Sequence, residues 1–182
     1  MAIFTIGHSN RTLEQFLELL TAQGVSLLVD VRTMPRSRYN PQFNRDTLPH
    51  MLAAQSIGYE HMPGLGGLRH PRKDSVNTGW RNASFRGYAD FMQTEEFARS
   101  LASLRKLASG QRTAILCAEA VPWRCHRSLI ADALTIGGVP VTHILSAGKT
   151  EPHQLTSFAR VEGARITYPG PELELFGPDA TT

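Results

Sequence analysis

Four short apolar runs, separated by helical or loop-forming segments, constrain the fold of this chain more than any other feature of its sequence. Two of them, VSLLVDV at residues 25–31 and TAILC at residues 113–117, are nearly continuous in apolar residues, as in strands that are buried on both faces. Strands that alternate with helices favour a parallel sheet with helices on both sides. The runs lie at residues 2–6, 25–31, 113–117 and 139–145, and a shorter strand is expected at residues 59–62.

Helical signals fill most of the segments between these runs. Apolar residues between positions 13 and 20 repeat at the spacing of one helix face, and Thr12 and Gln15 form a capping box before them. Further helices are expected around residues 48–52, near residues 88–91, after an N-cap at Thr94, and over residues 126–136. We therefore predict a three-layer α/β fold with a mostly parallel sheet of about five strands.

The length of 182 residues fits one domain, because domains average roughly 150 residues. We expect a single α/β domain over residues 1–168 and a C-terminal tail over residues 169–182. The first residues lack the basic segment of a signal peptide, and no uncharged apolar run approaches the roughly 18 residues of a membrane span. The predicted protein is cytoplasmic, without a membrane partner, and its two cysteines are expected as thiols.

Positive charge is concentrated in one part of the chain. Residues 31–86 contain nine basic and three acidic residues, a sum of +6, whereas the whole chain carries +3. This distribution favours an anionic partner, such as a phosphorylated substrate or a nucleic acid. The loop over residues 63–86 also holds Trp80 and Phe85, and basic residues interleaved with aromatic ones suit single-stranded nucleic acid. A solvated surface loop is the alternative interpretation.

Polar residues follow the carboxyl ends of the predicted strands, which is where ligands bind in open α/β sheets. The segments are GHSN after the first strand, DVR after the second, PGLGG after the third and CAEAVPWRCHR after the fourth. An internal salt bridge between Asp30 and Arg32 is an equally good interpretation of the second segment. PGLGG lacks the known nucleotide-binding patterns, so the sequence assigns no cofactor. The expected anion-binding or substrate-binding residues are His8, Ser9, Asn10, Asp30, Arg32, Arg36 and Arg127.

Cys125 is the expected nucleophile of a thiol-centred site. It precedes a predicted helix and lies between Arg124 and Arg127, and both the helix dipole and the positive charges lower the pKa of a thiol. The other expected catalytic residues are Cys117, as a second thiol, and Glu119 and His126, as proton carriers. Cysteines with purely structural roles are the alternative.

Two other kinds of site are compatible with the cysteine motif. Phosphatase-like and rhodanese-like loops place an arginine six positions after the cysteine, but here that position is Trp123 and Arg124 follows one residue late. A metal site is also open, although the adjacent ligands of a Cys-His pair rarely point at one ion. Its candidate ligands are Cys117, Cys125, His126 and Glu119, with His8 or His61 from other strands.

The tail contains a separate signal. PELELF at residues 171–176 resembles the QLxLF peptide with which bacterial DNA-repair and replication proteins dock onto the sliding clamp, except that Glu172 replaces the leading glutamine. A carboxylate cannot donate the hydrogen bonds of that amide. Docking would use Leu173, Leu175 and Phe176, and the alternative is that these residues fold back onto the domain.

The segments TIGHSN, VDVRTMPRS, PGLGG and CAEAVPWRCHR, in this order and spacing, resemble the uncharacterised bacterial family catalogued as domain of unknown function 488, over residues 4–145. The resemblance implies an α/β fold with the cysteine motif at a cleft, and it implies no activity. Our leading hypothesis from the residues is an enzyme with a thiol-centred site that acts on a phosphorylated or nucleic-acid substrate. The alternatives are a non-catalytic nucleic-acid-associated protein and a metal-binding protein that uses Cys117, Cys125 and His126.

Overall fold

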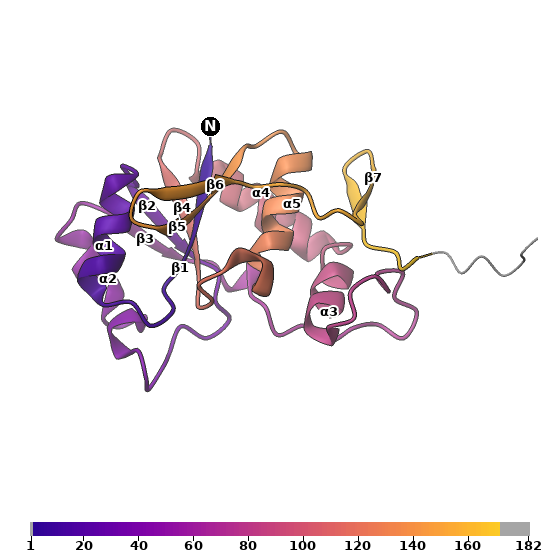
Figure 1. The fold of residues 1–182 in the computed structure, drawn as a ribbon, viewed down its shortest axis with the longest axis horizontal. Helices are drawn as coiled ribbons and strands as arrows, with labels where there is room; N and C mark the ends of the chain where they lie inside the picture. The colour runs from indigo at the N-terminus through magenta and orange to yellow at the C-terminus, as the bar shows by residue number, and fades with distance from the viewer. Residues whose placement is uncertain (1, 172–182) are drawn as a thin grey trace, which may run out of the picture.

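The computed structural model describes residues 2–171, and a six-stranded sheet forms its centre (Figure 1). The strand order is β3-β2-β4-β1-β5-β6, in which the first five strands are parallel and β6 pairs antiparallel with β5. The predicted α/β class is confirmed, and the antiparallel edge strand β6 was not predicted. The strands are β1 (Ile3–Gly7), β2 (Leu27–Asp30), β3 (Gly58–His61), β4 (Thr113–Cys117), β5 (Val141–Ser146) and β6 (Lys149–Pro152).

Helices cover both faces of the sheet, as Figure 1 shows for α1 and α2 on one side and α4 and α5 on the other. Alternate residues of each strand contribute to two separate apolar cores, because side chains of a strand point to opposite faces in turn. In β1, Ile3 joins the core under α3, α4 and α5, whereas Phe4 joins the core under α1 and α2. The helices are α1 (Leu13–Ala22), α2 (Leu48–Ala53), α3 (Ala83–Phe91), α4 (Glu95–Leu107) and α5 (Arg127–Ile136).

The predicted helix starts agree with the caps in the structure. Thr12 and Gln15 form a reciprocal capping box at α1, and the Thr94 hydroxyl accepts a hydrogen bond from the backbone N–H of Phe97 at α4. The helix predicted near residues 88–91 begins earlier, because the Asn82 side chain caps it. Short 3-10 turns that begin with proline complete the loops: η1 (Pro41–Phe43), η2 (Pro63–Leu65) and η3 (Pro122–Arg124).

The neighbouring strands β1 and β4 continue to opposite faces of the sheet. After β1 the chain enters α1 on one face, and after β4 it enters α5 on the other. Connections that diverge in this way leave a crevice at the carboxyl ends of the two strands, which is the usual ligand-binding position in open α/β folds. The residues that follow β1 and β4 are therefore the first to consider as a functional site.

The chain after β6 runs past α5 into a small hairpin of β7 (Arg160–Glu162) and β8 (Arg165–Thr167). Tyr168 then enters the core and is fully buried. The tail residues Leu173, Leu175 and Phe176 lie outside the described residues, so the predicted clamp peptide stays a prediction.

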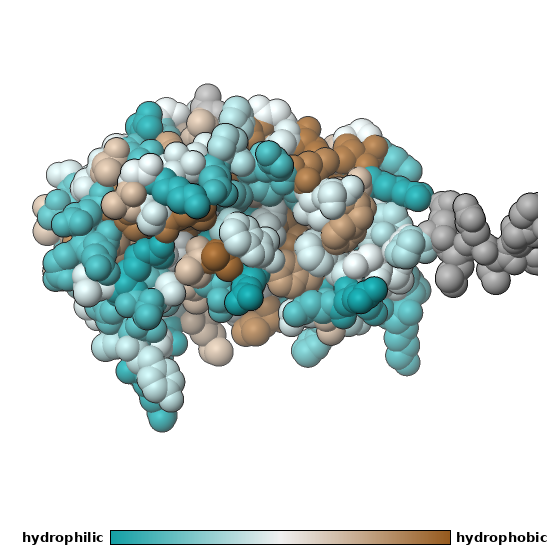
Figure 2. All heavy atoms as spheres, in the orientation of Figure 1, coloured by the Kyte–Doolittle hydropathy of each residue, from teal (hydrophilic) through white to brown (hydrophobic). Residues whose placement is uncertain are grey.

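The outer surface of the described residues is mostly polar. Figure 2 shows hydrophilic residues over much of one face, with apolar atoms exposed in places, among them near α5. Among residues 2–171, no helix combines the length and the apolar character that crossing a membrane requires.

Candidate functional site

Two cysteines and a histidine meet at the end of β4. The sulfur and nitrogen donor atoms of Cys117, Cys125 and His126 all lie within 4.8 Å of one another. The Nδ1 atom of His126 is 3.8 Å from the sulfur of Cys117 and 3.8 Å from that of Cys125. Both cysteines are free thiols and nearly inaccessible, with 7% and 3% of their surfaces exposed. Three soft or borderline metal-ligand atoms thus share one buried position.

The local fold explains this convergence. Cys117 is the last residue of β4, and its carbonyl accepts a hydrogen bond from the backbone N–H of His8, which follows β1. The turn η3 brings the chain back, so that Cys125 and His126 stand directly before α5. The imidazole of His126 packs against Tyr88 at a ring distance of 4.9 Å. A Cβ atom at Gly67 would lie 3.0 Å from that imidazole, so a larger residue there would displace the imidazole by a few tenths of an ångström.

Arg127 supplies a buried positive charge beside the two sulfurs. Only 1% of its surface is exposed, and its guanidinium donates to the carbonyl oxygens of Glu119 and Ala120 at 2.7 and 2.8 Å. No ion pair between described residues includes Arg127. Burying a cation is costly unless it is hydrogen-bonded or lies near negative charge, and ionisation of either cysteine would place such a charge beside Arg127.

The two thiols share a hydrogen bond that separates the pKa values of the pair. A hydrogen bond from the Cys125 thiol, supported by His126 and Arg127, holds the pKa of Cys117 well below its ordinary value. The same hydrogen bond, together with burial, raises the pKa of Cys125. Arg127 does act on Cys125 in the predicted direction, but its effect is smaller than that of the shared proton. The lowered and the raised pKa thus belong to the pair of thiols that shares this hydrogen bond, and Cys125 as the nucleophile stays a prediction.

Gly7 makes the close approach of the loop after β4 possible. A Cβ atom at this position would lie 1.7 Å from the carbonyl oxygen of Glu119 and 2.5 Å from the Arg127 guanidinium. A larger residue would displace the backbone that Arg127 holds. Gly7 was not among the predicted site residues, although a glycine at the end of a buried strand commonly marks a close backbone approach.

Asp30 and Arg32 form the internal salt bridge that the sequence left open. The Arg32 guanidinium contacts Asp30 at 2.5 Å and also donates to the carbonyl oxygen of Phe43. Its remaining Nη1 atom lies 3.2 Å from Nε2 of His8, and the Tyr59 hydroxyl donates to Asp30 at 2.8 Å. Both charged residues are buried, so the donors of Arg32 are used within the protein.

His8 belongs to this polar network and does not join the metal-ligand atoms. Its Nδ1 atom lies 2.8 Å from the carbonyl oxygen of Ser9, and its ring stacks on Phe43 at 4.5 Å. Burial lowers the pKa of His8, and the nearby Arg32 charge adds to that effect. The imidazole is therefore neutral at pH 7 and accepts the hydrogen bond from Arg32.

The other predicted site residues are dispersed around the rim. Asn10, Glu119 and Arg36 are exposed, and Ser9 is half-buried with a backbone φ of 50°. Arg36 lines a groove of about 640 Å³ together with Arg45 and His61, away from the cysteines. The Thr12 side chain accepts from the backbone N–H of Gln15 in the first turn of α1, so that donor is not free for an anion beside Ser9 and Asn10.

The aromatic residues of the long loop pack against the protein. Trp80 lies 4.7 Å from Phe85, 4.9 Å from Phe158 and 5.6 Å from Tyr168, measured between ring centroids. These contacts use much of the aromatic surface that the sequence analysis assigned to stacking on bases.

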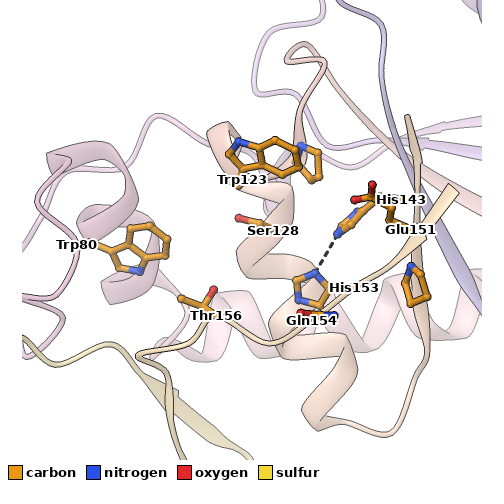
Figure 3. Close-up of a pocket in the computed structure, with 10 residues that line it drawn as sticks. Trp80, Trp123, Ser128, His143, Glu151, His153, Gln154 and Thr156 are labelled. Carbon is orange, nitrogen blue, oxygen red and sulfur yellow. Dashed lines mark hydrogen bonds between the residues drawn. The ribbon is translucent and has the colours of Figure 1, made fainter. Parts of the chain in front are cut away.

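A buried network of hydrogen-bonded polar residues lies beside α5 and was not predicted from the sequence. Nδ1 of His143 lies 2.7 Å from the Thr5 hydroxyl, its Nε2 lies 2.9 Å from Nδ1 of His153, and Nε2 of His153 donates to Asp132 at 2.8 Å (Figure 3). Asp132 is fully buried and also accepts hydrogen bonds from Thr156 and Tyr168. The available signal was a histidine in an otherwise apolar strand and an aspartate on the apolar face of a helix.

Burial, with smaller contributions from His153 and Arg127, lowers the pKa of His143 to about 4. Between about pH 6.5 and pH 4 the unfolded chain therefore binds more protons than the folded one. The free energy of unfolding decreases as the pH is lowered through this window, and the full contribution of His143 is present above it. We expect a loss of about 2 kcal/mol, allowing for partial screening by solvent. Urea unfolding at several pH values measures this loss, and the unfolding free energy should change less steeply with pH in His143→Gln. Parallel pH curves for the two proteins would contradict this assignment.

Residues 12–134 match the model of a protein family described as "Domain of unknown function DUF488". This span contains the two cysteines, His126 and Arg127, and it starts after His8 and ends before His143. It lies within residues 4–145, over which the resemblance was drawn. No curated protein and no solved structure matches the chain.

Proposed function

Since the chain belongs to the DUF488 family, whose description assigns no activity, we propose a function from the site itself: Cys117, Cys125 and His126 form a metal centre of the zinc type. The observation that carries this proposal is the common distance of 3.8 Å from Nδ1 of His126 to each sulfur. Two thiolates and an imidazole are a ligand set that zinc accepts, and soft ligands of this kind disfavour magnesium and calcium.

The spacing of the donors fits tetrahedral coordination. Zinc bonds of about 2.3 Å to sulfur and about 2.05 Å to nitrogen separate N from S by about 3.6 Å along a tetrahedron edge. The two distances of 3.8 Å require only a small adjustment to reach that geometry. Three protein ligands leave a fourth position for water or another ligand, as in catalytic zinc sites, where the metal acts as a Lewis acid.

The surroundings supply the charge balance for such a centre. Two thiolates neutralise a divalent ion, and the buried Arg127 then adds one positive charge. An anionic fourth ligand, such as hydroxide, would restore neutrality, so the site is suited to an anion at the open position. Nε2 of His126 is buried without a hydrogen-bond partner among the described residues, so ligation through Nδ1 would leave this N–H without an acceptor from them.

The test is the metal content of the purified full-length protein. We expect about one zinc per chain by elemental analysis, lost in Cys117→Ser, Cys125→Ser and His126→Ala, and retained in His50→Ala, an exposed histidine. Replacement by cobalt should give the thiolate charge-transfer absorption in the near ultraviolet. The metal centre would be refuted if the purified protein contained no metal and if added zinc did not protect its thiols from reaction.

The thiol-centred enzyme is the second candidate, and the observation in its favour is the buried Arg127 beside both sulfurs. In this proposal a thiolate of the Cys117–Cys125 pair attacks the phosphorus of a phosphorylated or nucleic-acid substrate. An S–P bond forms while the P–O bond to the leaving group breaks, and His126 or Glu119 donates a proton to the departing oxygen. Rapid alkylation of one thiol in metal-free protein, unchanged by zinc, would favour this candidate over the metal centre. The low exposure of both cysteines makes a small ligand easier to accommodate than a nucleic acid.

A further inference from the structure

A cavity of about 530 Å³ lies beside α5, which contributes Ser128 to its lining. Its size is within the range of small-molecule sites. Figure 3 shows its walls coming from separate parts of the chain: Trp80 from the long loop, Trp123 from η3, Ser128 from α5, and the segment around His153. Much of this lining follows residue 134, beyond the part of the chain that matches the family.

The two tryptophans of the chain, Trp80 and Trp123, both line this cavity. Trp80 is a rigid wall, because Phe85, Phe158 and Tyr168 hold its indole. Trp123 is 61% exposed, and no ring contact joins it to another described residue. An exposed indole beside a polar cavity is a ready stacking surface for a planar ring.

The polar groups of the cavity include both donors and acceptors. The indole N–H of Trp80 is buried without a hydrogen-bond partner among the described residues, so Trp80 contributes its ring to the wall and not this donor. Gln154 is exposed and offers an amide, and Glu151 offers a carboxylate that pairs with Lys149 at only 3.5 Å. The ring nitrogens of His143 and His153 already form hydrogen bonds with Thr5, with each other and with Asp132. They are therefore not available to a ligand in the cavity.

The charge of the cavity selects against phosphates. Of the described residues that line it, none is arginine or lysine, and Glu151 is the acidic one. An anionic ligand would meet the Glu151 carboxylate, while Lys149, the cation that pairs with it, does not line the cavity. A neutral heterocycle meets no such penalty.

We propose that this cavity binds a nucleobase-type heteroaromatic ring, as the free base or nucleoside, stacked on Trp123 with its polar edge toward Gln154 and Glu151. A ring nitrogen accepts from the amide, and an exocyclic amino group donates to the carboxylate. The proposal does not depend on the metal centre, because no metal ligand lines the cavity.

Intrinsic fluorescence reports on this cavity alone, since both tryptophans line it. We expect saturable quenching of the full-length protein by one or more of adenosine, guanosine, cytidine and uridine, with correction for nucleoside absorption and confirmation by calorimetry. The corresponding 5′-monophosphate should bind more weakly, and ribose should have no effect. Trp123→Ala should weaken binding between about fivefold and a hundredfold, whereas Trp123→Tyr should keep most of it.

The matched control is Tyr39→Ala, which removes an aromatic ring that is 95% exposed outside the cavity and should leave binding unchanged. Trp123→Ala should melt at the wild-type temperature and keep its metal content, so failure here is distinct from failure of the metal centre. Absence of quenching at millimolar nucleoside, or equal binding by wild type and Trp123→Ala, would overturn the proposal. Tighter binding of the monophosphate would overturn the assigned charge preference.

Discussion

Replacing Asp132 with alanine is expected to destabilise the protein by about 4 kcal/mol or more, because several buried donors lose their acceptor at once. Asp132 accepts from Nε2 of His153 at 2.8 Å, from the Tyr168 hydroxyl at 2.8 Å, and from the backbone and hydroxyl of Thr156 at 3.0 and 2.7 Å. These contacts attach residues 153–168 to α5. Urea unfolding measures the loss of stability, and hydrogen exchange should show opening of this segment first.

Two variants separate the hydrogen-bonded role of Asp132 from a general effect of substitution. Asp132→Asn keeps the shape and one acceptor oxygen, so it should lose about 1–3 kcal/mol. Asp46→Ala alters an exposed aspartate and should change stability by less than about 0.5 kcal/mol. If Asp132→Ala unfolds at the same urea concentration as Asp46→Ala, the carboxylate does not hold the C-terminal segment.

Arg32→Met should destabilise the protein by about 3–5 kcal/mol, because it leaves the Asp30 carboxylate buried without its ion pair. Asp30 is 0% exposed and Arg32 is 7% exposed, and Nη2 of Arg32 also donates to the Phe43 carbonyl at 2.7 Å. An anion clamp at the rim would instead tolerate the change and lose only ligand binding. The midpoint of urea unfolding distinguishes these two roles.

The double variant Asp30→Leu, Arg32→Met removes both charges and should recover part of the stability that Arg32→Met loses. Arg36→Met provides a matched control, since Arg36 is exposed, and should have little effect. Should the single variant Arg32→Met unfold like wild type, the salt bridge would contribute nothing and an anion-binding role for Arg32 would regain support.

The sequence was sufficient to predict the parallel part of the sheet and the starts of α1 and α4, because those features depend on local periodicity and caps. It did not predict β6 or the β7–β8 hairpin. Their residues are mostly exposed, as in β7, where Arg160, Val161 and Glu162 all face solvent, so burial leaves no periodic signal in them.

The candidate site was predictable in position and less so in chemistry. Ligands bind at the carboxyl ends of the strands in such sheets, and this indicated Cys117 and the loop to Cys125. The adjacent residues Cys125 and His126 were expected to point apart. In the structure they follow the turn η3, and His126 lies near both sulfurs. Which thiol is more acidic depends on a hydrogen bond between residues eight positions apart. The pairing of His143 with His153 likewise depends on the β5–β6 turn, which local sequence did not reveal.

The position of β4 between β2 and β1 has a consequence for synthesis of the chain. Both neighbours of β1 come late, since β4 begins at Thr113 and β5 at Val141, so a nascent chain of 112 residues holds β1 without either partner. Unpaired strand edges in such intermediates are prone to aggregate. The strands β2 and β3 can pair early, but β1 can join them only after β4 has been made, and Cys117 is the last residue of that joining strand.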